Sequence, residues 1–324
     1  MNEMVRSARQ WAVAAALGVA TVAAAQPLPC KVIRVINPSA PGGNSDIVFR
    51  LFAGKMGEIL GQQLVLDYRP GAGGTIGADM TAKSAPDGCT AAIVAASFVI
   101  NPALIKKLPF DTVKDFTPLG LVVDIPTSVT VHPSLPVKNV KDLIALAKGK
   151  PGELFFSSSG PGTVGHLAGE LLNSTAGIRI THVPYKGIAP GVVDLIAGQV
   201  QLSFASIPVV IENVSSGKLR MIAQCGNTRS SSVPDVPTMQ EGGLKGFVVS
   251  SGFSFIGPAG MPRAVVDKLN GVLVKSLQDP SVRKELINRG ADPVGNTPEQ
   301  HAAYIRAEIE KWQKVAAQAG IQPE

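Results

Sequence analysis

KVIRVINPSAPGGNSDIVFRLF, residues 31–52, predicts an apolar strand, a glycine-rich turn and the first turns of a helix. A second stretch, ELFFSSSGPGTVGHLAGELL at residues 153–172, has the same layout. Glycines let the backbone approach a ligand closely, and the helix N-terminus that follows offers free N–H groups and the positive end of the helix dipole. Each stretch is therefore typical of an anion site. One in each half of the chain suggests two halves that close on a small anion.

Strands and helices alternate outward from these two stretches. Apolar strands are predicted at 32–36, 64–66 and 90–95, and helices at 46–60, 75–84, 139–148, 163–176 and 189–198. This βαβ rhythm favours an α/β fold with a mostly parallel sheet covered by helices on both faces. The last third is richer in helix signals, among them a capping box from Thr297 to Gln300.

The length and composition of the chain allow two domains. It has 324 residues, 45% of them hydrophobic and 17% charged, which is enough for two separate cores. Two extended segments, 119–131 and 248–256, could carry the chain from one domain to the other and back. We therefore expect a first domain of residues 26–123 and 251–324, a second of residues 124–250, and a hinge between them.

The amino terminus is typical of a secretory signal peptide. Arg6 and Arg9 precede an apolar run at 11–25 that ends in three alanines suited to cleavage. We expect residues 1–25 to be removed and the mature protein to be periplasmic; a buried N-terminal helix is the alternative. No later segment reaches the ~18 uninterrupted apolar residues of a membrane span.

The sequence disfavours several functional classes. The net charge of +6 is spread without basic runs or interleaved aromatic residues, which argues against nucleic-acid binding. The glycine segment at 71–77 lacks the spacing and acidic partner of a dinucleotide fingerprint. The four histidines have no metal-ligand spacing, so we expect no metal and no other cofactor. Serines at 157–159 with His166 could suggest a hydrolase, but no nucleophile elbow accompanies them, and we expect no catalytic residues.

The cysteines are Cys30, Cys89 and Cys225, an odd number that does not make a disulfide framework. Pairing of Cys89 with Cys225 is compatible with an oxidising compartment. Sequence alone leaves that pairing open.

Polar residues beside the glycine loops are candidate ligand contacts. His166 falls on a first helical turn, where it could bond the loop or a ligand, and Asp46 begins a helix, where capping is favoured over catalysis. Ser97 and Asn101 flank a strand end, the edge at which open α/β sheets bind ligands, with plain turn chemistry as the alternative. The segment 185–187 is a third rim loop, unless its lysine is only a solvated surface charge.

Eight short motifs, taken in order, resemble those of one family. They are PGGNSD (41–46), RPGAGG (69–74), APDG (85–88), DFTP (115–118), GPGTVGHL (160–167), HVPYKG (182–187), PDVPT (234–238) and GPAG (257–260). After the signal peptide, the whole chain is similar to tripartite tricarboxylate transporter substrate-binding proteins of the Bug (TctC-like) family. The resemblance implies an α/β, two-domain periplasmic binding protein of type II with a ligand cleft between the domains.

The resemblance also implies a function. A small carboxylate would be held in the cleft, partly through backbone groups and bridging water, and delivered to a membrane permease of one large and one small subunit. We therefore expect a solute-binding protein, a monomer and not an enzyme. The alternatives are a periplasmic enzyme or a ligand-sensing receptor module on the same fold. The expected ligand-binding residues are Ser39, Ala40, Gly42, Gly43, Asp46, Ser97, Asn101, Ser158, Gly162, Thr163, His166, Tyr185, Lys186 and Ala205.

Two departures from the family pattern concern the ligand. Ser39 stands at a position that is often aromatic in the family, which puts aromatic stacking on the ligand in doubt. Where relatives often carry two acids, this chain has Gln201 and Ala205. The second acid, where it faces the pocket, can hold an amino group. We therefore expect an acid without an amino group to bind better than its amino-acid counterpart.

Overall fold

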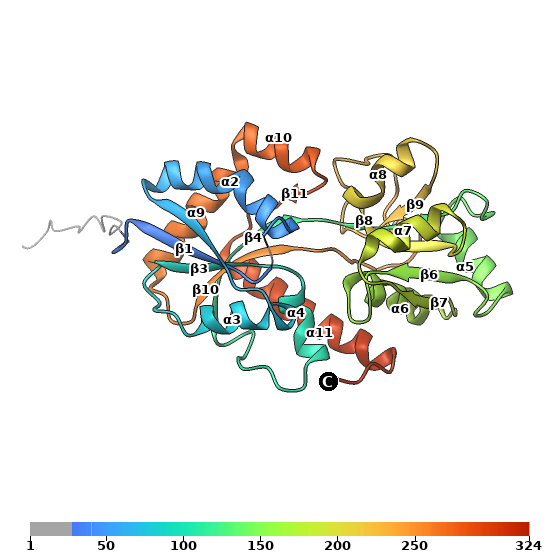
Figure 1. Cartoon of the computed structure of the whole chain (residues 1–324), viewed down its shortest axis with the longest axis horizontal. Helices are drawn as coiled ribbons and strands as arrows, with labels where there is room; N and C mark the ends of the chain where they lie inside the picture. The colour runs from blue at the N-terminus through green and yellow to red at the C-terminus, as the bar shows by residue number, and fades with distance from the viewer. Residues whose placement is uncertain (1–27, 40, 324) are drawn as a thin grey trace, which may run out of the picture.

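A computed structural model describes residues 28–39 and 41–323, which form two lobes side by side (Figure 1). The predicted signal peptide and Ala40 lie outside the described residues. The first lobe contains a six-stranded sheet and the second a five-stranded sheet, each covered by helices on both faces. The α/β architecture expected from the sequence is confirmed.

The first lobe is built from both ends of the chain. Its strands, in spatial order, are β11 (Asp292–Pro293), β4 (Phe116–Asp124), β10 (Phe253–Pro258), β3 (Thr90–Val94), β1 (Val32–Asn37) and β2 (Gln63–Tyr68). The helices on one face are α2 (Asn44–Leu60), α9 (Arg263–Gln278) and α10 (Pro280–Asn288). Those on the other are α3 (Thr75–Ala82), preceded by the short turn η1 (Ala72–Gly74), α4 (Ser97–Leu104) and α11 (Pro298–Gln318).

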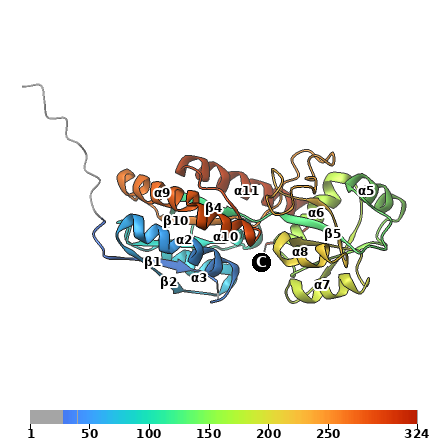
Figure 2. The ribbon, with the colours of Figure 1, turned by 90° about the horizontal axis from the view of Figure 1, so that it is seen from above.

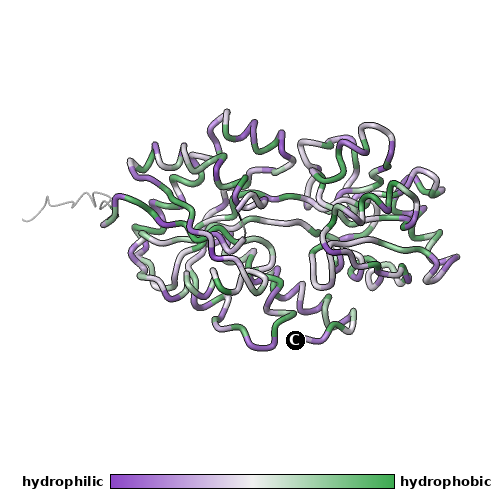
Figure 3. Tube along the Cα trace, in the orientation of Figure 1, coloured by the Kyte–Doolittle hydropathy of each residue, from purple (hydrophilic) through white to green (hydrophobic). Residues whose placement is uncertain are grey.

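The second lobe comes from the middle of the chain. Its strands, in spatial order, are β7 (Thr181–Pro184), β6 (Phe155–Ser158), β8 (Leu202–Ser206), β5 (Thr127–Val131) and β9 (Arg220–Gln224). The helices α5 (Val140–Gly149) and α6 (Val164–Ala176) share one apolar cluster, and α7 (Ile188–Ile196) and α8 (Ile207–Ser215) share another. Hydrophobic and hydrophilic residues alternate along these helices, as expected when one helix face is buried (Figure 3).

Both sheets are mixed, which corrects the expectation of a mostly parallel sheet. In the first lobe β1 runs parallel to β2 and β3, but β10 runs antiparallel to β3 and β4. In the second, β6 runs parallel to β7 and β8, but β5 runs antiparallel to β8 and β9. The reversed strands β5 and β10 are the first strands after the chain crosses between lobes, and the two-residue strand β11 also runs antiparallel to β4. Because β5 and β10 each enter a sheet from the other lobe, each starts at the edge of the sheet where the neighbouring strands end, and so it runs in the opposite direction.

This arrangement brings many strand ends to the junction of the lobes. The carboxyl end of β4 leads into the crossing, and β1 and β3 run in the same direction as β4. In the second lobe β5 starts at the crossing, so β8 and β6, which run the opposite way, end there. The loops that follow β1, β3, β6 and β8 therefore face the opposite lobe, as ligand-binding loops of α/β sheets do.

Two crossing segments connect the lobes, and they are hydrogen-bonded to each other. The Ser251 N–H donates to the Ile125 carbonyl at 2.9 Å, and the Thr127 N–H donates to the Val249 carbonyl at 3.2 Å. Pro126 and Ser250 form an isolated antiparallel bridge between these bonds. The connection is thus a short two-stranded ribbon, which restricts relative motion of the lobes mainly to bending and twisting at this point.

Helix α11 also links the lobes. It begins with the predicted capping box, in which the Thr297 hydroxyl accepts from the Gln300 N–H at 3.2 Å. The helix packs on β4 and α4 and reaches α6 of the second lobe (Figures 1 and 2). Trp312 on α11 is fully buried in a cluster that includes side chains of both lobes. None of the helices in the described residues is long and apolar enough to span a membrane.

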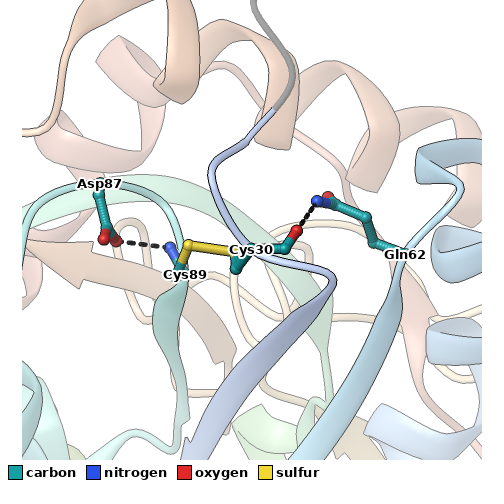
Figure 4. Close-up of a disulfide and its surroundings, with 4 residues drawn as sticks. All are labelled: Cys30, Gln62, Asp87 and Cys89. Carbon is teal, nitrogen blue, oxygen red and sulfur yellow. Dashed lines mark hydrogen bonds between the residues drawn. A yellow bond between two sulfur atoms is a disulfide. The ribbon is translucent and has the colours of Figure 1, made fainter.

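The disulfide joins Cys30 to Cys89, not Cys89 to Cys225 (Figure 4). Cys30 precedes β1 and Cys89 precedes β3, and these parallel neighbours bring the two Cα atoms to 5.9 Å. Cys225 follows β9 in the second lobe, where its free thiol is buried and its pKa is raised by burial. The disulfide therefore lies at the amino ends of the strands, away from the junction of the lobes.

Candidate ligand-binding site

A cavity of about 660 Å³ lies between the lobes and is lined by the loops described above. The first lobe contributes the β1–α2 loop, the β3–α4 segment and Gly73. The second contributes the β6–α6 loop, the β8–α8 segment and Ile188. Ser251 and Phe253 come from the second crossing. The volume of this cavity is in the range of small-molecule binding sites.

None of the described residues that line this cavity has a charged side chain. The polar lining consists of hydroxyls and amides, from Ser39, Asn44, Ser45, Ser97, Asn101, Thr127, Ser159, Thr163, Ser206 and Ser251. The larger apolar side chains are Ile100, Leu104, Ile105, Val164, Ile188, Phe204, Val209 and Phe253. An anion in this cavity would be held by dipoles rather than by ion pairs.

Two helix N-termini provide the strongest of these dipoles. Helix α2 begins at Asn44 and helix α6 at Val164, and both residues line the cavity. The first N–H groups of a helix have no partner within the helix, and they carry its positive partial charge. Neither N-cap residue, Gly43 or Thr163, caps its helix through a side chain. The free N–H groups of both helices are therefore available to one anionic ligand.

The two loops that lead into these helices have the same backbone conformation. Gly42 and Gly162 have φ values of +78° and +72°, a region that favours glycine. The next residues, Gly43 and Thr163, are extended, with φ/ψ of −72°/169° and −79°/161°. The similarity that the sequence predicted is thus a similarity in three dimensions.

The structure brings about half of the predicted site residues to the cavity wall. Those that line it are Ser39, Gly43, Ser97, Asn101, Gly162, Thr163 and Ala205. Those that do not are Gly42, Asp46, Ser158, His166, Tyr185 and Lys186. Ser97 and Asn101 are one helical turn apart on α4, which the sequence suggested only as a strand end. Ala40 lies outside the described residues.

Several of the residues away from the wall support the loops. The Gly42 N–H donates to the Asp46 carboxylate at 2.8 Å, which lowers the Asp46 pKa; Tyr68 and Arg50 lower it further. The Gly162 N–H donates to His166 Nδ1 at 3.1 Å, and the Ser158 hydroxyl bonds His182 Nε2 at 2.7 Å.

The remaining candidates point elsewhere. The Tyr185 hydroxyl donates to Asp194 at 2.7 Å, and burial, followed by Asp194, raises the Tyr185 pKa to about 12. Lys186 is exposed. Gln201 accepts a hydrogen bond from the Phe155 N–H at 2.9 Å, away from the cavity. Ala205 faces the cavity from β8 and is 2% exposed.

Several wall residues were not among those predicted from the sequence. Asn44 and Ser45 belong to the quoted glycine loop, and their place at the start of α2 was a sufficient signal. Ile100 and Leu104 lie four residues apart on α4, but that helix was not predicted. Thr127, Ser206 and Ser251 come from strand ends that meet only in the folded chain.

A side cavity of about 290 Å³ opens beside the main one on the first lobe. It shares Ser39, Gly73, Ala95, Ser97 and Asn101 with the main cavity. Asn101, 8% exposed, donates to the Gly73 carbonyl at 3.2 Å and so connects α4 to the glycine turn. That turn leads into α3, as the sequence predicted.

The described residues give no indication of metal or nucleophile chemistry. No group of three or more His, Cys, Asp or Glu side chains gathers within the part of the chain that the structure describes. Ser158 is bonded to a histidine, but it is fully buried and lies outside the cavity wall. A serine in that position cannot attack a bound substrate.

The chain is similar to known proteins over most of its length. The model of the tripartite tricarboxylate transporter family receptor, TctC, matches residues 48–321. Protein BugT of Bordetella pertussis is 36% identical over 308 residues, covering 94% of each protein. The structure of R. palustris Rpa4515 with adipate is similar, with a TM-score of 0.75, 35% identity, and coverage of 91% of this chain and 99% of that one. MatC (Rpa3494) from Rhodopseudomonas palustris with bound malate gives a TM-score of 0.70, 31% identity, and coverage of 89% and 99%.

Proposed function

Because this chain belongs to the TctC family of tripartite tricarboxylate transporter receptors, we propose that it captures a small carboxylate in the periplasm for uptake by a tripartite tricarboxylate-type permease. The family consists of solute-binding proteins, not enzymes. The observation that carries the proposal is the cavity between the lobes, in which two helix N-termini meet and charged side chains are missing from the described wall. Similar proteins have been solved with adipate and malate, both carboxylates.

The family alone supports the proposal of a permease partner. Its expected composition is one large and one small membrane subunit, and the binding protein would act as a monomer. Export would remove residues 1–25, leaving a first domain of residues 26–123 and 251–324 and a second of residues 124–250.

The wall favours an acid without an amino group. An ammonium group in this cavity would lose its water without gaining an anionic partner, which costs several kcal/mol. Ala205 supplies no charge, and Gln201 is engaged elsewhere. Hydroxyls, amides and free N–H groups can all serve a carboxylate.

The experiment is a thermal-shift panel of mono- and dicarboxylates with their amino-acid counterparts, on ligand-free purified protein. Ligand at ~100 times its dissociation constant adds about 2.7 kcal/mol of stability, which such a panel resolves. We expect succinate to stabilise the protein more than aspartate at equal concentration. Mass spectrometry of the ligand released from protein purified from its host would identify the natural acid. Stabilisation by amino acids but by no simple carboxylate would refute the proposal.

A further inference from the structure

The two glycine loops use the same support with different chemistry. In each, the N–H of the left-handed glycine donates to the side chain four residues later. In the first lobe that acceptor is the Asp46 carboxylate, and in the second it is the His166 imidazole. Both acceptors lie behind the cavity wall. Neither acceptor therefore touches a ligand in the cavity, and each supports the loop that lines it.

The hydrogen bonds around His166 define its tautomer. Nδ1 accepts the Gly162 N–H at 3.1 Å, so the ring proton must be on Nε2. Nε2 lies 3.9 Å from a carboxylate oxygen of Glu170, one turn further along α6, which favours the same tautomer. His166 must therefore be neutral for this loop conformation, because a protonated Nδ1 would face the Gly162 N–H with a second donor.

A second imidazole packs against the first. The rings of His166 and His182 are stacked with centroids 4.1 Å apart. His182 bonds the Ser158 hydroxyl at 2.7 Å, and that hydroxyl also accepts the Gly160 N–H at 3.1 Å. The stack thus supports the loop at two points, Gly160 and Gly162. A positive charge on either ring would be unfavourable beside the other.

We infer that His166 is a positioning residue of the second half-site, and that its protonation releases the Gly162 loop and weakens carboxylate binding. This inference rests on the proposed function and adds a pH dependence to it. Burial lowers the pKa of His166, and burial with the neighbouring His166 lowers that of His182 to about 4. The hydrogen bond from the Gly162 N–H to His166 is therefore present near neutral pH, and it breaks as the pH falls through the His166 pKa.

Of the ionisable groups that face His166 in the described residues, Glu170 would attract a protonated ring and His182 would not. Within the described residues, His166 lies against Glu170 of the same helix and His182 of β7. Helix α11 also packs on α6, but within the described residues none of its charged side chains pairs with His166. The Asp46 acceptor of the first lobe is already ionised, with a lowered pKa, and does not titrate in the same range.

Two amide variants separate acceptor position from packing. In His166→Asn the amide oxygen replaces Nδ1, whereas in His166→Gln it replaces Nε2. We expect His166→Asn to keep the Gly162 amide protected from hydrogen exchange in the ligand-free protein. His166→Gln and His166→Leu should speed that exchange, and should weaken succinate binding by about tenfold.

The pH profile supplies the second readout. As the pH falls from about 8 to 4.5, wild-type affinity for succinate should decrease relative to that of His166→Asn, which lacks the titrating ring, by up to about the tenfold loss expected for His166→Gln. Ionisation of succinate affects both proteins alike and cancels in their ratio. In wild-type protein the Gly162 amide signal should titrate together with the His166 ring, an observation that needs no variant.

Equal Gly162 exchange in the Asn and Gln variants would overturn the inference. So would wild-type and His166→Asn profiles that run parallel with pH. The exchange measurements are made without ligand, so they decide the role of His166 even if succinate and every other carboxylate fail to bind. That last result would refute the proposed function instead.

Discussion

The Thr163 side chain lines the cavity, but its proton is already used. The hydroxyl donates to the Gly160 carbonyl at 2.7 Å, so it offers a ligand carboxylate no second proton in this orientation. Its removal should loosen the loop without removing a direct charged hydrogen bond. We expect Thr163→Val to weaken succinate binding by about 2- to 10-fold, measured by calorimetry.

Thr163→Ser is the matched control, because it keeps the hydroxyl and removes only a methyl group. It should bind like the wild type. A loss beyond ~100-fold in Thr163→Val would mean that the hydroxyl turns to the ligand on binding and donates to its carboxylate.

Ala205 tests the selectivity of the wall. An aspartate at this buried position would repel a dicarboxylate and pair with an ammonium group. We expect Ala205→Asp to shift the ratio of succinate to aspartate affinity by about tenfold or more towards aspartate. Titration of both ligands against the variant measures the shift.

Ala205→Asn has nearly the same volume without the charge, and it should leave the ratio close to that of the wild type. If both variants shift the ratio equally, size rather than charge decides selectivity at this position. If wild-type protein already prefers aspartate, another residue holds the amino group.

The Cys30–Cys89 disulfide attaches the start of β1 to the start of β3. The cysteines are 59 residues apart in sequence, a loop for which chain entropy predicts about 4 kcal/mol of stabilisation. Replacing both cysteines by serine should lower the free energy of unfolding by about that amount in urea titrations. Reductant should lower the stability of the wild type to the same level and leave the variant unchanged. Ligand affinity should not change, because the disulfide lies at the sheet edge opposite the cavity; a large change would mean that β1 and β3 transmit strain to the loops.

Helix α11 is docked through a buried neutral histidine. His301 Nδ1 accepts the Gly120 N–H at 3.0 Å and Nε2 bonds the Ser254 hydroxyl at 2.8 Å, which ties the helix to β4 and β10. Burial lowers the His301 pKa to about 3. An unfolded histidine has a pKa near 6.5, so between these values the unfolded state binds a proton that the folded state excludes.

The contribution of neutral His301 to the free energy of unfolding should therefore be fully present above about pH 6.5. It should decrease as the pH falls, by up to about 1.4 kcal/mol per pH unit. Urea titrations from about pH 7 to pH 4.5 should show a steeper decrease for the wild type than for His301→Asn. Equal slopes would indicate that His301 becomes protonated in the folded protein without cost.

At the level of the whole molecule, the two lobes can approach each other only by deforming the two crossing segments and the α11 contact. The crossings are bonded to each other, and Lys311 on α11 donates to the Val248 carbonyl at 3.1 Å, beside the second crossing. Both lobes contribute anion-binding N–H groups to one cavity, so a ligand should be bound most tightly when they are closest.

We therefore expect saturating ligand to reduce the radius of gyration measured by small-angle X-ray scattering. The hinge should lie near residues 119–131 and 248–256. The reference sample must be stripped of carried-over ligand by unfolding and refolding, so that it is truly ligand-free. Identical radii in the two states would count against hinge closure.

Much of the local structure could be predicted because it depends on residues close in sequence. The strand, glycine turn and helix at 31–52 and at 153–172 formed as expected, since φ values above zero at Gly42 and Gly162 and the helix starts that follow are set within a few residues. The capping box at Thr297 is confirmed for the same reason. These short-range patterns were enough to indicate an α/β chain with two anion-binding loops.

Contacts between distant segments settled the rest. Three features depend on which strand ends meet in the folded chain. They are the pairing of Cys89 with Cys30, the reversed directions of β5 and β10, and the presence of Asn101 but not Lys186 in the cavity wall. Asp46 and His166 could be placed on first helical turns from the sequence. Their shared role is visible only in the folded chain, where both loops line one cavity and each is bonded to one of these side chains. A pattern of neighbouring residues does not predict these long-range contacts, because they depend on how the two sheets and helix α11, which links the lobes, pack together.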